Sequence, residues 1–194
     1  RIQTEPICQP LDAHLTTQPV ARRIRMPKKE LRLRLGISNR SRMIVLTMGG
    51  TQQPYNFPTT LLNQPKVTFV IPGSSRTVKR RDNVVHLPYH SEFFHPDLIN
   101  AADAVIGKLG VSTIAEAYHA GTPFGYVKRP RFRESRVLAA YVERHLHARA
   151  ITETQFQNGK WIRRLSDLLT VKRQRRKGPN GAMQAAKYIH KLLR

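Results

Sequence analysis

The sequence predicts an α/β protein with a Rossmann-like parallel sheet flanked by helices. Three observations lead to this prediction: unbroken apolar runs of strand length recur along the chain, segments with helical spacing separate them, and the first run ends in two glycines. Unbroken apolar runs are typical of strands that are buried on both faces, and regular alternation of strands with helices indicates a parallel sheet.

The elements follow one another in this order. The expected strands cover residues 43–48, 66–71, 83–87, 103–107, 123–127 and, in a shorter run, 149–152. The expected helices cover residues 58–63, 96–102, 113–120, 134–146, 159–169 and 181–193.

Three parts of the chain differ in character. Residues 1–42 hold scattered apolar positions and a basic cluster, and we expect a surface connector that follows a missing N-terminal domain. One short helix over 30–35 interrupts it, with Pro27 in its first turn and Gly36 at its end. Residues 43–170 form the Rossmann-like domain, and residues 171–194 form a basic loop and a C-terminal helix.

The charge of the chain is strongly positive. Of 194 residues, 34 are Lys or Arg and 12 are Asp or Glu, which gives a net charge of +22. A basic nucleic-acid-binding module is one alternative that this charge allows. No aromatic-interleaved recognition motif accompanies the dispersed basic clusters, so we do not expect nucleic acid as the partner. A solvated face or peripheral contact with an anionic membrane explains the charge as well.

The single cysteine, Cys8, allows no internal disulfide, and no apolar run approaches the length of a membrane span. We therefore expect a cytoplasmic protein, with peripheral membrane contact as an option.

The first candidate motif is Gly49-Gly50-Thr51, directly after the strand at 43–48. Ligands of open parallel sheets collect beyond the carboxyl ends of the strands, and a glycine turn lets backbone N–H groups approach a phosphate. A plain strand-ending turn is the alternative. The spacing matches neither the dinucleotide fingerprint nor the P-loop.

The second candidate motif lies in residues 102–127. A strand ends at Gly107, a turn contains Lys108 and Gly110, and a helix opens at Ser112 or Thr113, so helix N–H groups and a cation converge on one anion site. Glu116 has two interpretations: it closes a capping box with Thr113, or its carboxylate accepts hydrogen bonds from the vicinal hydroxyls of a sugar.

The second motif resembles the nucleotide-sugar signature of GT-B glycosyltransferases, especially those related to the N-acetylglucosaminyltransferase of peptidoglycan assembly. The residues that carry the resemblance are Lys108, Gly110, Ser112, Thr113, Glu116, Gly121 and Pro123. It extends over about residues 20–193, the C-terminal half of such an enzyme, and implies inverting transfer from a nucleotide-diphosphate sugar, with a UDP-sugar as the expected donor.

The resemblance also implies roles for individual residues. Glu116 would hold the ribose hydroxyls, and the base would lie against a loop that contains Tyr89, Phe93 and Phe94. The diphosphate would lie between Gly49, Gly50 and Thr51 on one side and Lys108, Gly110, Ser112 and Thr113 on the other.

The sugar-reading loop departs from the family pattern. Arg133, Glu134 and Ser135 stand where the related peptidoglycan enzyme has paired glutamines, so we expect these three residues to select the sugar or meet the leaving diphosphate. A similar signature occurs in a transferase-like domain fused to plant sugar kinases. A non-catalytic nucleotide-sugar-binding domain is therefore a second alternative, and the catalytic base is unknown.

We expect neither a metal nor a cofactor. There is no Asp-x-Asp motif, which fits a transferase that neutralises diphosphate with helix ends and cations. The histidines that could suggest an active site lack ligand-spaced partners, and we expect no metal or catalytic role for them: His86, His90, His95 and His119.

Overall fold

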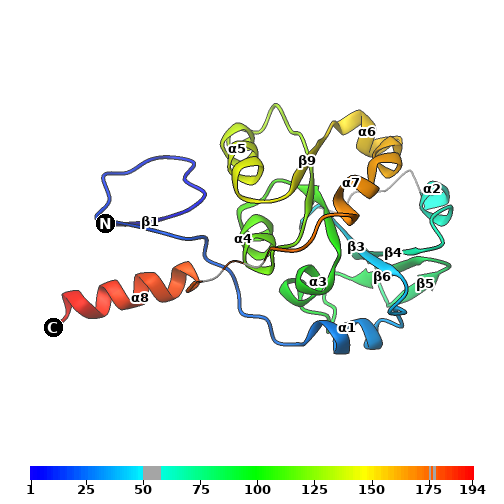
Figure 1. The fold of residues 1–194 in the computed structure, drawn as a ribbon, viewed down its shortest axis with the longest axis horizontal. Helices are drawn as coiled ribbons and strands as arrows, with labels where there is room; N and C mark the ends of the chain where they lie inside the picture. Colours follow the sequence, from blue (N-terminus) through cyan, green and yellow to red (C-terminus); the bar gives the residue numbers. More distant parts are fainter. Residues whose placement is uncertain (50–57, 175, 177) are drawn as a thin grey trace.

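A seven-stranded sheet forms the centre of the molecule (Figure 1). The computed structural model describes residues 1–49, 58–174, 176 and 178–194. The strands, in the order in which they lie in the sheet, are β5 (Lys79–Arg81), β6 (Val84–Pro88), β4 (Val67–Ser75), β3 (Arg42–Thr47), β7 (Ala104–Lys108), β8 (Phe124–Val127) and β9 (Ala148–Ile151). Every neighbouring pair is parallel except β5 with β6. This confirms the predicted fold class.

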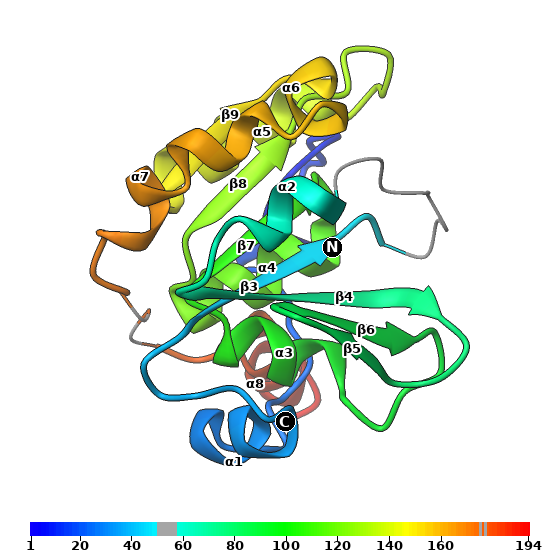
Figure 2. The ribbon, with the colours of Figure 1, turned by 90° about the vertical axis from the view of Figure 1, so that its right-hand side faces the viewer.

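Helices cover both faces of this sheet (Figure 2). One face carries α1 (Lys28–Arg34), α3 (His95–Ala101), α4 (Val111–Ala120) and α5 (Ser135–His145), and their apolar side chains share one core with the sheet. The other face carries α2 (Pro58–Leu62), α6 (Glu153–Gln157), the 3-10 turn at Lys160–Arg164 and α7 (Ser166–Leu169), over a second core. The continuous apolar strands are therefore buried on both sides, as the sequence predicts.

All six predicted strands are present, and each begins within one residue of its expected start. The sequence did not predict β5, whose three residues are exposed cations on the sheet edge, where charge prevents pairing with another chain. It also did not predict α6, and the helix expected over 159–169 is divided into the 3-10 turn and α7.

The expectation of a surface connector over residues 1–42 is wrong for its second half. Leu31 is fully buried, and Leu35 and Ile37 are nearly so, all within the core of the sheet. Asp103 fixes this helix by accepting hydrogen bonds from Lys28 at 3.1 Å and Arg32 at 3.0 Å. The α/β domain therefore includes α1.

The two ends of the chain pack against each other and project from one side of the domain (Figure 1). Residues 1–17 form a small parallel pair, β1 (Ile2–Thr4) with β2 (Leu15–Thr17), and α8 (Gly181–Leu192) lies against β2. The Gln18 N–H donates to Gln184 at 2.7 Å, and a Cβ on Gly181 would lie 1.9 Å from the Gln18 carbonyl oxygen. No helix within the described ranges is long and apolar enough to cross a membrane.

The order of the strands creates a switch point between β3 and β7. After β3 the chain builds β4 and β6 on one side of it, then returns to place β7 on the other side. Connections leave the carboxyl ends of β3 and β7 in opposite directions, which opens a crevice there, the usual ligand position in an open α/β sheet. The Gly49 turn and the Lys108–Thr113 turn are the segments that follow these two strands.

Candidate functional site

A cavity of about 580 Å³ lies beyond the carboxyl ends of β3 and β7. We call it the crevice, and its volume is in the range of small-molecule sites. The predicted site residues that line it are Gly49, Tyr89, Phe93, Phe94, Lys108, Gly110, Ser112 and Thr113. Gly50 and Thr51 lie outside the described residues. The two predicted turns thus share one crevice.

Gly49 and Lys108 form one wall of the crevice. Gly49 adopts a left-handed backbone conformation with a φ of 67°, and a Cβ there would lie 2.7 Å from Lys108 Cε and 3.0 Å from Nζ. The left-handed backbone favours glycine, and any side chain at this position would force the end of Lys108 to move. Burial lowers the pKa of Lys108, and the nearby charge of Arg129 lowers it further. The crevice thus contains a cation that is partly shielded from water.

The N-terminus of α4 lines the same crevice. Gly110 is its N-cap residue with no side-chain cap, so the first N–H groups of this ten-residue helix face the crevice mouth without a competing side chain. The capping-box interpretation is wrong, because a cap at Gly110 makes Thr113 the third helical residue and Glu116 the sixth. Glu116 is too far along the helix to reach the cap.

Glu116 instead belongs to a hydrogen-bonded cluster with Arg22 and His95. Its Oε1 accepts from Arg22 Nε at 3.1 Å and from Nη2 at 2.8 Å. Its Oε2 lies 2.7 Å from His95 Nδ1, and because a carboxylate only accepts, this ring nitrogen carries the hydrogen. The cluster extends to the Gly49 turn, since His95 Nε2 lies 3.3 Å from Thr47 Oγ1, which accepts from the Gly49 N–H at 3.3 Å.

Sequence reasoning missed Arg22 and His95, both of which line the crevice. Arg22 was assigned to the connector, and His95 was one of the histidines for which no role was expected. One signal in the sequence could have identified His95 as a site residue: it follows directly after the loop that contains Tyr89, Phe93 and Phe94, which we call the aromatic loop, and begins the next helix. Across the described part of the chain, no three side chains of His, Cys, Asp or Glu gather as a metal site would need.

The aromatic residues of the predicted base loop have different environments. Phe93 is almost fully buried in the core, and Tyr89 is 59% exposed at the crevice. Phe94 is covered by two guanidinium groups, with Arg25 Cζ 3.9 Å and Arg22 Cζ 4.8 Å from the ring centroid. Tyr89 is therefore the aromatic side chain most accessible to a base.

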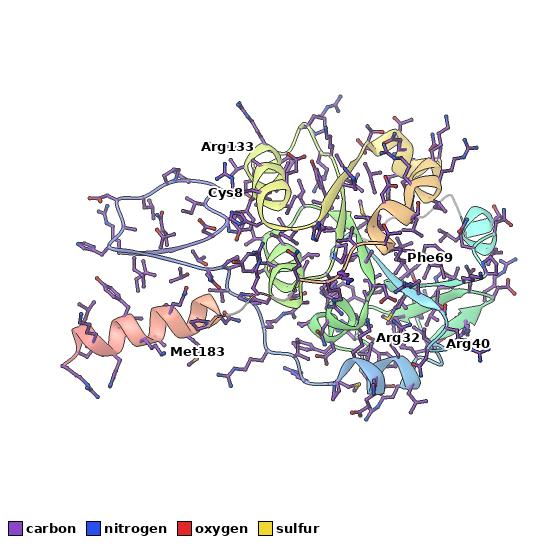
Figure 3. The ribbon with its side chains drawn as sticks, in the orientation of Figure 1. Cys8, Arg32, Arg40, Phe69, Arg133 and Met183 are labelled. Carbon is purple, nitrogen blue, oxygen red and sulfur yellow. The ribbon has the colours of Figure 1, made fainter. Side chains whose placement is uncertain are left out.

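The predicted sugar-reading residues lie beside another hollow. Arg133 lies by α5 (Figure 3), and Arg133 and Ser135 line a hollow of about 670 Å³ together with Lys128, Arg129 and Arg136. We call it the second hollow. Among the described residues that line the crevice, none comes from 128–136. Arg129, which lines the second hollow, is near enough for its charge to lower the pKa of Lys108 in the crevice.

Residues 61–193 match the family model described as the glycosyltransferase family 28 C-terminal domain. The chain belongs to this family. L-arabinokinase of Arabidopsis thaliana is 29% identical over 167 residues, which cover 86% of the chain and 16% of that protein. The chain thus spans a small part of this relative.

Solved glycosyltransferases share the fold of this family 28 domain. MurG of Acinetobacter baumannii has a TM-score of 0.60 at 14% identity, over 93% of this chain and 57% of that one. The spinosyn forosaminyltransferase SpnP has a TM-score of 0.58 at 15% identity, over 87% and 46%. SnogD of Streptomyces nogalater has a TM-score of 0.55 at 19% identity, over 92% and 49%. The fold is that of the C-terminal domain of GT-B glycosyltransferases.

Proposed function

We propose that this family 28 domain binds the nucleotide-diphosphate sugar donor of an inverting glycosyl transfer. One observation carries the proposal: the Gly49 turn, Lys108 and the N-terminus of α4 meet in a single crevice at the switch point of the sheet. Backbone N–H groups, a helix N-terminus and a lysine are all groups that bind phosphate. A UDP-sugar is the donor that the family resemblance favours.

In this proposal the diphosphate lies between Gly49 and the first turn of α4. Charge grows on the diphosphate as the bond to the sugar breaks, and fixed positive groups that face it stabilise the transition state. Lys108 and the helix dipole supply this stabilisation, so the transfer needs no metal and no cofactor. Gly50 and Thr51 follow Gly49 in the sequence and are proposed to take part.

The ribose is proposed to bind Glu116. A carboxylate accepts two hydrogen bonds in a plane, which fits the neighbouring 2′ and 3′ hydroxyls. Tyr89, which lines the crevice, is proposed to pack against the base. Arg133, Glu134 and Ser135 are proposed to act on the sugar or on the departing diphosphate, from the loop that leads to the second hollow.

The acceptor site and the general base are proposed to lie outside these residues. The chain covers 46–57% of the three solved glycosyltransferases named above, so each has a further part of similar size. This division supports donor binding as the proposed role of the family 28 domain. Contact with an anionic membrane stays a prediction from charge alone.

The test is a thermodynamic cycle on Glu116 and the ribose hydroxyls. Calorimetry would measure the dissociation constants of UDP and 2′,3′-dideoxy-UDP for the native chain and for Glu116→Gln. We expect Glu116→Gln to weaken the binding of UDP by about 1.5 to 3 kcal/mol, the cost of lost hydrogen bonds to a charged group. The binding of dideoxy-UDP should change little. Any general loss of stability affects both ligands and cancels in the cycle.

Glu92→Gln is the matched control, because it removes the same charge from an exposed position on the aromatic loop. It should leave both dissociation constants unchanged. Equal losses for UDP and dideoxy-UDP in Glu116→Gln would remove the ribose role of Glu116. Failure of the native chain to bind UDP or any other nucleoside diphosphate, with binding of short nucleic acids instead, would support the nucleic-acid module.

A further inference from the structure

The carboxylate that the ribose would need is already occupied. The Glu116 side chain is 3% exposed and lies behind Arg22 and His95, whose side chains are 55% and 25% exposed. Two guanidinium N–H groups bond its Oε1, and the imidazole bonds its Oε2. A ribose in the crevice reaches this carboxylate only when one of these partners moves.

Arg22 is the partner that can move. It lies on the segment between β2 and α1, more than half of its side chain is exposed, and its guanidinium also lies over the Phe94 ring. The contact with Phe94 does not depend on the hydrogen bonds to Glu116, so a guanidinium that leaves the carboxylate can keep a favourable aromatic contact.

The His95 side chain is held more firmly than that of Arg22. It begins α3, and each of its ring nitrogens has a partner, Glu116 on one side and Thr47 on the other. The hydrogen bond from His95 Nδ1 holds Glu116 Oε2 in place. Glu116 Oε1 is then the oxygen that can exchange Arg22 for the ribose hydroxyls.

We propose that Arg22 is an internal competitor of the ribose: its guanidinium fills the acceptor positions of Glu116 Oε1, and a nucleotide gains Glu116 by displacing it. This inference rests on the proposed nucleotide-sugar site. The two Arg22 N–H groups on one oxygen are replaced by ribose hydroxyls, so the exchange conserves hydrogen bonds to the carboxylate. The competition lowers the affinity only of ligands that carry the hydroxyls, because a ligand without them leaves Arg22 where it is.

The experiment compares UDP with 2′,3′-dideoxy-UDP on variants of Arg22. The measured quantity is the ratio of the dissociation constant of dideoxy-UDP to that of UDP. Under the proposal, Arg22→Ala raises this ratio about tenfold, which corresponds to about 1.4 kcal/mol. Arg22→Met, which keeps an unbranched apolar side chain and removes the donors, raises it equally. Urea unfolding of both variants checks that they fold.

Arg25→Ala is the matched control. Arg25 lies over the same Phe94 ring, and within the described ranges its guanidinium forms no hydrogen bond or ion pair with Glu116. The ratio should not change. In the native chain, UDP should also shift the ¹⁵N signal of Arg22 Nε at saturation, and dideoxy-UDP should leave it in place.

The outcomes separate this inference from the proposed function. An unchanged or lower ratio in both Arg22 variants, with discrimination still lost in Glu116→Gln, overturns the competitor and leaves the donor site standing. Equal weakening of both ligands by Arg22→Ala makes Arg22 a phosphate ligand and also overturns it. If neither the native chain nor the Arg22 variants bind UDP, dideoxy-UDP or any other nucleoside diphosphate, both proposals are overturned.

Discussion

Replacing Gly49 by alanine tests the geometry of the crevice wall. Gly49 has a φ of 67°, a conformation that costs a residue with a Cβ about 1 to 2 kcal/mol. The new Cβ would lie 2.7 Å from Lys108 Cε, so the lysine must move. Because that atom is near the end of a flexible side chain, the movement itself costs little, and the backbone term decides the stability.

We therefore expect Gly49→Ala to lower the free energy of unfolding by about 1 to 2 kcal/mol in urea denaturation. A second effect follows at Lys108. Its pKa is lowered by burial and by Arg129, and a lysine pushed toward water should have a pKa closer to the ordinary value. NMR titration of the lysine ε-methylene signals would measure this rise.

Gly110→Ala is the matched control for Gly49→Ala. Gly110 has a φ of −147°, and a Cβ there meets nothing within 4 Å among the described residues. Its cost should be limited to the poorer N-cap, on the order of 0.5 kcal/mol. Equal stabilities of the two variants, together with an unchanged Lys108 pKa in Gly49→Ala, would refute the argument that the left-handed turn places Gly49 against Lys108.

Three further predictions concern residues around the site. Asp103→Asn should lower the free energy of unfolding by about 2 to 3 kcal/mol, because it leaves the buried Arg32 without its carboxylate. Burial raises the pKa of Asp103, but hydrogen bonds from Met43, Lys28 and Arg32 outweigh this effect and hold the pKa below its usual value. The stabilisation by Asp103 is therefore full above the unfolded pKa near 3.9 and is lost as the pH falls through the folded pKa, which urea unfolding across that range would measure. His95→Ala should weaken UDP about tenfold in calorimetry, since the carboxylate loses the hydrogen bond that fixes Oε2; unchanged affinity would exclude this positioning role. Arg133→Ala should leave the UDP affinity within about twofold, because the side chain lines the second hollow, and should lower kcat more than it raises KM in a protein that carries the acceptor half.

The sheet could be predicted from the sequence because its strands are buried on both faces. The strands β3, β4, β7 and β8 are then largely apolar runs, and each of the six predicted strands begins within one residue of its expected start. The crevice was also predictable, because strand order places glycine turns at the same sheet edge. The exposed strand β5 was not, since its three cations carry no strand pattern.

The Arg22–Glu116–His95 cluster could not be predicted from local patterns. Arg22 and Glu116 are 94 residues apart in the chain, and His95 and Glu116 are 21 apart. The Thr113–Glu116 spacing suggested a capping box, but the helix begins at Val111 because Gly110 is its cap, and this offset turns Glu116 toward α3. Long-range contacts of this kind depend on how α3 and α4 pack together on the sheet.

The position of a bound nucleotide is the measurement that tests the account most directly. A crystal structure of the chain with UDP should show the diphosphate between Gly49 and the first turn of α4, and the ribose hydroxyls on Glu116 Oε1 with the Arg22 side chain displaced. UDP bound in the second hollow, or anywhere outside the crevice, would contradict the proposed donor site.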